Sequence, residues 1–380
     1  MKEQSKELTS FLLIVIHLVS SISIYFYENK LIGLFTLLIE FASCIILFFL
    51  NNRHIVNTTP IVVVLILNIF SLCATMLFHT GFGVVGIYFN MILAILIFGN
   101  ISISKDLYRQ LHLLTAILIS LFIFTSKITI HYETILFEGT FGDDINANML
   151  GVWALASFYH WMCFLSTAKI SKTIKILCRI IVSIVAVYYI NISDCRSALF
   201  AIILFFILIV FKKKPLKNKS FNLVVKILLI GSLLFTILYV RLAENYGDIE
   251  VFGKDLFSGR QYVWESAFKQ IKKYPIFGSG TDFSMIANGQ GETTQSTHNT
   301  VLGLLRTLGI IPTVTFLIYA GKTHDFKEKT KVDKYAQFAF ISCLLVAFFE
   351  QILTERFTYM LFLSFLLFNI KQDERRSMLR

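Results

Sequence analysis

Long apolar runs separated by polar connections make up most of the chain. They lie at about 8–27, 31–50, 60–79, 82–99, 111–130, 149–168, 173–192, 196–211, 221–240, 299–320, 335–353 and 354–370. Most have a length close to that of a helix that crosses the hydrocarbon core of a bilayer, about 20 residues. They also lack the period-two alternation of membrane β-strands. The pattern therefore predicts an all-α integral membrane protein with about twelve transmembrane helices, forming one polytopic domain over residues 1–380.

The composition excludes a soluble enzyme. Of the 380 residues, 56% are hydrophobic and 16% are charged, whereas a soluble domain carries about 25% charged residues. The six cysteines lie in or beside apolar runs and show no metal-ligand spacing, so neither a zinc site nor a disulfide framework is indicated. The first apolar run lacks a small-residue cleavage site, and we interpret it as a retained anchor rather than a removed signal peptide.

The basic residues indicate a membrane topology rather than a nucleic-acid surface. The net charge is +11, and if the N-terminus is cytoplasmic, 24 of the 35 Lys and Arg residues fall in cytoplasmic segments or the tail. This excess is what the positive-inside rule predicts. A nucleic-acid surface would instead gather the charge on one exposed domain. We therefore expect both termini to be cytoplasmic.

Two outer loops stand out in this topology. The larger one, residues 242–298, joins the ninth and tenth predicted spans. Loops of this length are usually functional, and we expect this one to be catalytic. The smaller one, residues 131–148, contains Asp143 and Asp144.

Two arginines lie at the predicted outer face without an obvious anchoring role. Arg196 begins an apolar run, where a charge is costly unless it is paired, reaches the interface or faces a cavity. Arg260 opens a predicted amphipathic helix that ends at Pro275 and suits the membrane surface. The first turn of a helix already attracts anions, so an arginine there is well placed for a phosphate. The alternatives are a snorkelling Arg196 and a simple interfacial anchor helix.

His298 lies where the large loop re-enters the membrane, next to Asn299. The ordinary pKa of histidine, about 6.5, lets an imidazole act as a base at neutral pH. A lone histidine is more often a hydrogen-bonded side chain at the membrane interface, which is what we expect of the seven others. Asn299 could orient a substrate hydroxyl.

Two arginines and one histidine at an outer membrane face suit one reaction in particular. Glycosyl transfer from a polyprenyl-diphosphate sugar needs a neutralised leaving group, which arginine provides bidentately without a metal. It also needs a base for the attacking hydroxyl. The chain has no Asp-x-Asp motif, and Asp143 with Asp144 is the nearest candidate for a metal-holding pair. We therefore expect neither a metal nor another cofactor.

Three motifs, in this order and topology, resemble the O-antigen polymerase and O-antigen ligase family of bacterial membrane enzymes. RSAL at Arg196–Leu199 resembles the family's Arg and Leu at the start of a span. SGRQYVW with the downstream YPIFGSG resembles its Arg-x-x-x-Trp and Pro-x-x-Gly-x-Gly stretch. THNTVLGLLRTLG, from Thr297 to Gly309, resembles its His-Asn, nine residues, Gly pattern. One departure is Arg306, near which the family often has an acidic residue.

The resemblance implies a metal-independent, inverting glycosyltransferase with a GT-C-like fold in the bacterial cytoplasmic membrane. Arg196 and Arg260 would hold the diphosphate of an undecaprenyl-linked glycan, and His298 would activate the acceptor, a glycan or lipid-linked glycan. Four further residues are candidate substrate contacts: Arg241, Trp264, Asn299 and Arg306. Membrane lipid and a chain-length regulator are further expected partners, and nucleic acid is not.

We interpret the chain as a polymerase that joins lipid-linked repeat units of an O-antigen or capsular polysaccharide. One alternative is a ligase that moves the finished glycan onto lipid A core or another acceptor. The alternative from another class is a lipid-linked oligosaccharide flippase. A transporter usually places ionisable residues near the membrane midplane. Here the candidates gather at one face, which favours the enzyme.

The topology can be tested with single cysteines in a cysteine-free background. A membrane-impermeant thiol reagent added from outside should label position 290, in the large loop, and should leave position 216, in the basic loop, unlabelled. The reason is the cytoplasmic excess of Lys and Arg. Labelling at 216 and protection at 290 would overturn the topology.

Overall fold

The computed structural model describes the greater part of the chain. The described residues are 2–23, 25, 30–51, 102–131, 134–138, 144–145, 147–246, 250–251, 254–255, 259–280, 285–286, 293–294, 296–320, 330–331, 333–350 and 369–371. The predicted spans at 60–79 and 82–99, and nearly all of that at 354–370, lie outside these residues. So do Asp143 and Gln290.

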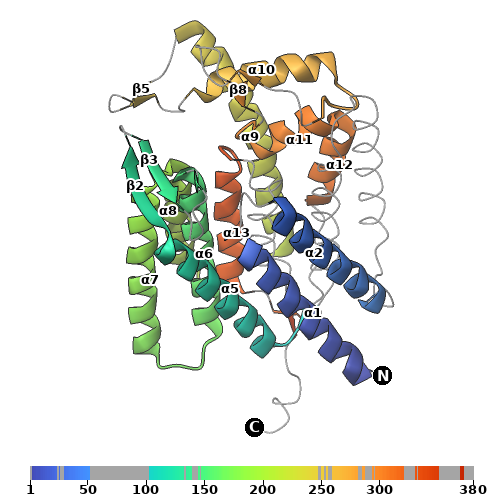
Figure 1. Ribbon diagram of the computed structural model, residues 1–380, viewed down its shortest axis with the longest axis vertical. Helices are drawn as coiled ribbons and strands as arrows, with labels where there is room; N and C mark the ends of the chain where they lie inside the picture. The colour runs from blue at the N-terminus through green and yellow to red at the C-terminus, as the bar shows by residue number, and fades with distance from the viewer. Residues whose placement is uncertain are drawn as a thin grey trace.

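Helices dominate the described chain (Figure 1). They are α1 Lys2–Ser23, α2 Lys30–Asn51, α5 Lys105–Thr125, α6 Ala147–Thr167, α7 Lys172–Ile192, α8 Arg196–Phe211, α9 Asn218–Tyr246, α10 Arg260–Lys273, α11 Thr300–Leu308, α12 Ile310–Ala320 and α13 Lys334–Val346. Most begin and end within a few residues of the apolar runs, and α8 coincides with the run at 196–211. The amphipathic helix predicted to begin at Arg260 is confirmed as α10.

Four of the described helices are long and apolar enough to cross a membrane, namely α5, α6, α7 and the 219–244 part of α9. The outward faces of α7, α8 and α9 expose large aliphatic and aromatic side chains, among them Ile184, Phe211 and Leu238, which are 61–76% exposed. Such surfaces suit contact with lipid tails. The chain is therefore a helical membrane protein, and the full count of twelve spans stays a prediction.

Short strands, which the all-α prediction did not include, connect several helices. They are β1 Ser102–Ile103, β2 Lys127–His131, β3 Thr134–Glu138, β4 Asp144–Ile145, β5 Glu250–Val251, β6 Lys254–Asp255, β7 Met285–Ile286, β8 Thr293–Thr294, β9 Thr330–Lys331 and β10 Asn369–Lys371. Antiparallel pairing joins β2, β3 and β4 in one small sheet, and β5–β6 and β7–β8 form two hairpins. In the third group β10 pairs with β1 in parallel and with β9 antiparallel.

Three predicted spans differ from the observed helices. The run at 335–353 ends as helix α13 at Val346, and turns follow from Ala347 to Phe349. The run at 111–130 ends as a helix at Thr125, where Ser126 closes the last turn through its N–H and hydroxyl on the Phe122 carbonyl oxygen. The β-branched residues that follow then favour strand β2. The run at 299–320 is broken into α11 and α12 at Gly309, whose φ of 84° ends the first helix.

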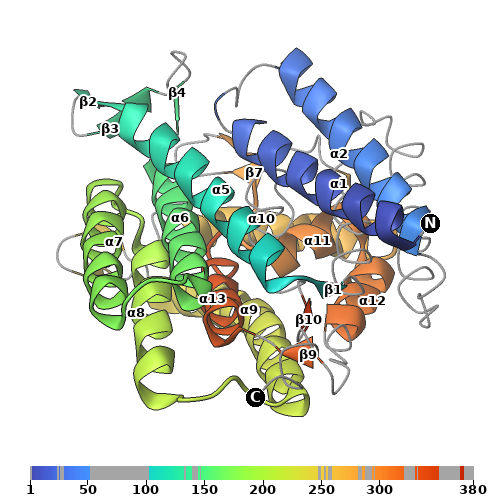
Figure 2. The same cartoon turned by 90° about the horizontal axis from the view of Figure 1, so that it is seen from below.

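The helices α6 and α13 lie in the middle of the bundle, between α7 and α8 on one side and α1 on the other (Figure 2). Side chains without charge fill most of their faces, including fully buried Trp153, Phe158 and Phe338. Hydrogen bonds also cross this core: His112 and His160 share a 2.9 Å Nδ1–Nδ1 bond between α5 and α6. These two histidines are hydrogen-bonded, as expected, but in the core. Polar bonds of this kind help to join helices in lipid.

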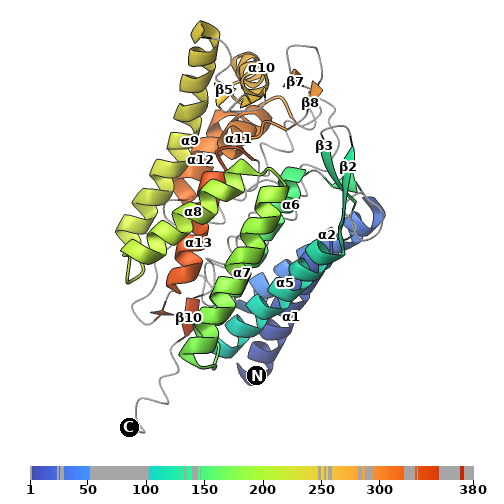
Figure 3. The same cartoon turned by 90° about the vertical axis from the view of Figure 1, so that its left-hand side faces the viewer.

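The helices α10 and α11 lie across one end of the bundle, and α1 begins at the opposite end (Figures 1 and 3). The segment that follows α10 packs against the break between α11 and α12. There the Ser279 N–H donates to the Arg306 carbonyl oxygen at 2.7 Å, and the Ile310 N–H donates to that of Pro275 at 2.9 Å. Two backbones that approach so closely leave no room for side chains at the crossing.

Glycines occupy the two closest positions of this crossing. A Cβ atom on Gly309 would lie 2.0 Å from the Ile276 carbonyl oxygen, and one on Gly278 would lie 2.4 Å from the Thr307 carbonyl. Both glycines also have positive φ angles, 84° and 72°, which favour glycine. The pattern Pro-x-x-Gly-x-Gly and Gly309, which nine residues separate from His-Asn, thus meet at a single contact.

Gly309→Ala should lower the free energy of unfolding by more than about 2 kcal/mol, because it adds both a clash and a strained φ angle. The thermal unfolding midpoint of the detergent-purified protein measures the effect. Gly231→Ala is the matched control, because its Cβ would meet only the Phe348 ring at 3.8 Å. In helix α9 an added alanine should leave the midpoint unchanged or higher. Equal midpoints for both variants would contradict the crossing.

Candidate functional site

Glu350 joins two of the predicted site residues. Its Oε1 lies 2.6 Å from Nη2 of Arg260, and its Oε2 lies 3.2 Å from Nδ1 of His298. The side chains of Arg260, His298 and Glu350 are 16%, 28% and 10% exposed. One largely buried carboxylate therefore holds a guanidinium and an imidazole at the end of the bundle where α10 and α11 lie.

The sequence reasoning missed Glu350. It stands four residues after α13, near the end of a run predicted as a transmembrane helix. A charged residue in such a run is costly unless it is paired, and this cost was the signal that could have singled it out. The identity of its partners could not be read from the sequence, because they lie 90 and 52 positions away.

Arg260 is the first residue of α10, and Gly259 precedes it with a left-handed φ of 77°. This turn lets the chain start helix α10 within the large loop. The guanidinium also lies over the Phe349 ring, with its carbon 6.0 Å from the ring centroid. Arg260 is thus held from two consecutive residues of one segment, Phe349 and Glu350.

His298 is held in an uncommon backbone conformation. Its φ of 47° makes it one of two non-glycine residues with positive φ in the described chain, the other being Asp194. Such strain persists only where the surroundings determine it, and it is frequent at functional sites. Here the Trp264 indole N–H donates to the Thr297 carbonyl oxygen at 2.9 Å, and the His298 N–H donates to Oγ of Ser296 at 3.3 Å.

The residues after His298 tie the loop to the segment that carries Glu350. Asn299 caps α11 by accepting from the Leu302 N–H at 2.9 Å, and its amide donates to the Phe348 carbonyl oxygen at 2.9 Å. The Thr300 hydroxyl donates to the backbone oxygen of Glu350 at 3.0 Å. These bonds fix the distance between His298 and Glu350 through the backbone as well as through the side chains.

Arg196 is the first residue of α8 and follows the buried Cys195. Burial raises the pKa of the neighbouring Cys195 thiol to about 11, and the nearby charges of Glu350 and Arg260 also act on this pKa, in opposite directions. Arg196 itself is 34% exposed and lies 3.9 Å from the Asp194 carboxylate. The turn is pressed against α6, since a Cβ on Gly151 would lie 2.3 Å from that of Cys195.

The four predicted substrate contacts have different surroundings. Trp264 is fully buried in a cluster with Tyr239 and Leu302, and Asn299 is fully buried at its cap. Arg306 is 1% exposed and donates to Oε1 of Gln270 at 3.4 Å, which links α11 to α10. Arg241 is exposed on α9. The surroundings of Trp264, Asn299 and Arg306 favour a role in positioning the loop.

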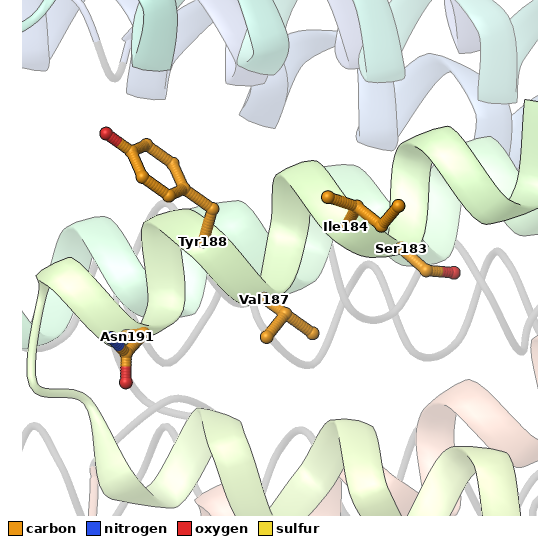
Figure 4. A pocket seen from close by; sticks show the side chains of 5 residues that line it. All are labelled: Ser183, Ile184, Val187, Tyr188 and Asn191. Carbon is orange, nitrogen blue, oxygen red and sulfur yellow. The ribbon is translucent and has the colours of Figure 1, made fainter.

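The described residues contain no group of three or more His, Cys, Asp or Glu side chains that could hold a metal ion. A shallow hollow on α7 is lined by Ser183, Ile184, Val187, Tyr188 and Asn191 (Figure 4). Its lining residues carry no charge, and Glu350 is not one of them. We therefore take the charged cluster as the candidate site.

The comparisons with known proteins agree with the resemblance seen in the motifs. A family model described as O-antigen ligase matches residues 181–317. The match runs from the second half of α7 into α12 and includes Arg196, Arg260 and His298, but it ends before Glu350. No curated protein matches the chain.

Proposed function

We propose that this chain, whose residues 181–317 form an O-antigen ligase family domain, is a polysaccharide polymerase of the bacterial cytoplasmic membrane. It would join undecaprenyl-diphosphate-linked repeat units of an O-antigen or capsule at the outer face. The observation that carries the proposal is the shared carboxylate of Glu350, which sets a phosphate-binding side chain, Arg260, next to a base, His298.

The imidazole has a defined tautomer in this arrangement. With Nδ1–H donating to the Glu350 carboxylate, Nε2 of His298 is left as the proton acceptor. A carboxylate in this position orients the ring and stabilises the imidazolium that forms. Glu350 is therefore a positioning residue, and His298 is the general base.

The transfer step can be written with these groups. Nε2 of His298 takes the proton from the acceptor sugar hydroxyl while its oxygen bonds to C1 of the donor sugar. The bond from C1 to the phosphate oxygen breaks, and the electron pair leaves with undecaprenyl diphosphate. Attack opposite the leaving group inverts the anomeric carbon. Arg260 and Arg196 would stabilise the charge on the diphosphate as it leaves.

Arg260→Ala and Arg196→Ala should each abolish most glycan product. Losing a charged hydrogen bond to a buried anion costs about 2–5 kcal/mol, or roughly thirtyfold to several thousandfold. Arg260→Lys should stay poor, because lysine cannot form the bidentate fork. His298→Ala should lose about 10²–10⁴ in rate. The measurement is glycan formation by purified protein from a lipid-linked repeat unit.

Lys269→Ala is the matched control, because Lys269 lies on the same helix but is 74% exposed and pairs with Glu265 on the surface. It should retain activity. Full activity of Arg260→Lys would argue against bidentate binding of phosphate. Movement of the lipid-linked glycan across a membrane without a new glycosidic bond would favour the flippase instead.

The intermediate that accumulates in a deletion strain separates polymerase from ligase. Without a polymerase, cells should hold single repeat units on the lipid carrier or on the final acceptor. Without a ligase, they should hold long chains still attached to undecaprenyl diphosphate. We expect single repeats, because the Gly-Arg, Trp, Pro and Gly-Ser-Gly sequence resembles the polymerases more closely. Gel analysis of extracted glycolipids distinguishes the two, and long lipid-linked chains would contradict the expectation.

A further inference from the structure

Arg260 is already occupied by an anion in the site as it stands. Its Nη2 lies 2.6 Å from Oε1 of Glu350, and both side chains are largely buried. A guanidinium buried alone would be costly, and pairing offsets part of that cost. The pair also holds the arginine in place. It does, however, put a carboxylate where the proposed function requires the diphosphate.

We propose that Glu350 is an internal competitor of the donor, occupying Arg260 until the lipid diphosphate displaces it. This inference rests on the proposed function. A diphosphate that approaches the guanidinium brings negative charge next to the carboxylate, and like charges at close quarters repel strongly. The fork of Arg260 can satisfy the incoming phosphate oxygens in place of Oε1, so the exchange keeps the arginine paired.

After the exchange, Glu350 remains bound to its other partner, His298. Oε2 already accepts from Nδ1 of His298 at 3.2 Å, and the backbone oxygen of Glu350 is held by the Thr300 hydroxyl at 3.0 Å. The carboxylate released from Arg260 therefore stays beside the imidazole. Its charge is then available to stabilise the imidazolium that forms when the acceptor is deprotonated. Donor binding thus prepares the base, which makes the donor the first substrate to bind.

The isosteric variant Glu350→Gln separates this role from a merely structural one. Gln keeps the shape and the backbone bonds but removes the competing charge. The affinity of the variant protein for undecaprenyl diphosphate should rise by about tenfold or more. It is measured in detergent from the change in tryptophan fluorescence as the diphosphate is added. The turnover of the variant should fall by about 10²-fold or more, because the imidazolium loses its counter-charge. A structural residue would lose both affinity and turnover.

Glu265→Gln is the matched control. Glu265 lies on α10 like Arg260, but it pairs with Lys269 on the surface and is 39% exposed. Glu265→Gln removes one carboxylate charge, as Glu350→Gln does, but outside the site, and it should change neither affinity nor turnover. The thermal unfolding midpoint of each variant checks that it is folded. Should Glu350→Gln fail to fold, Glu350→Ala provides the second test, because it removes the same competing charge and should again bind diphosphate more tightly.

The outcomes distinguish this inference from the proposed function. Unchanged or weaker diphosphate binding by folded Glu350→Gln, with wild-type protein still making glycan, would overturn the competition alone. If Glu350→Gln binds diphosphate more tightly but keeps the wild-type turnover, the released carboxylate does not act on His298. Wild-type protein that binds the diphosphate without forming a glycosidic bond would overturn the proposed function, while the comparison of affinities would still decide the competition.

Discussion

The carboxylate of Glu350 lies between a guanidinium and an imidazole, and the candidate site depends on this shared charge. Arg260 comes from the start of α10, and His298 comes from the end of the large loop. Neither position is near the other in the chain; the segment after α13 contacts both, and the Trp264–Thr297 hydrogen bond also joins α10 to the loop. Because a buried charge is costly unless it is paired, removing one of the three groups would leave another without its partner.

Close backbone contacts and side-chain bonds to the backbone both support this arrangement. The glycines Gly278 and Gly309 let the segment after α10 cross the break between α11 and α12. The hydrogen bonds of Asn299 and Thr300 then attach the start of α11 to the end of α13. The proposed glycosyl transfer would thus rest on this junction, where a small displacement would separate His298 from Glu350.

The core beneath the site adds a second, different kind of support. Histidines His112 and His160 bond to each other in the helical core, and Tyr159 bonds to Ser342 of α13 at 2.6 Å. These polar contacts join α5, α6 and α13 inside the bundle. They hold helix α13, and Glu350 follows four residues after its end. The geometry of the site therefore depends on packing within the bundle.

Hydrophobic run length and amphipathic period are local properties, and the sequence by itself therefore determined most helices, including α8 and the start of α10 at Arg260. It also singled out Arg196, Arg260 and His298, because charged or titratable residues beside apolar runs are costly and so informative. Only the tertiary structure decided that Glu350 joins two of them, that Trp264 and Asn299 support the loop, and that 299–320 forms two helices. These features depend on contacts between residues far apart in the chain, and such contacts leave no periodic signal in the sequence.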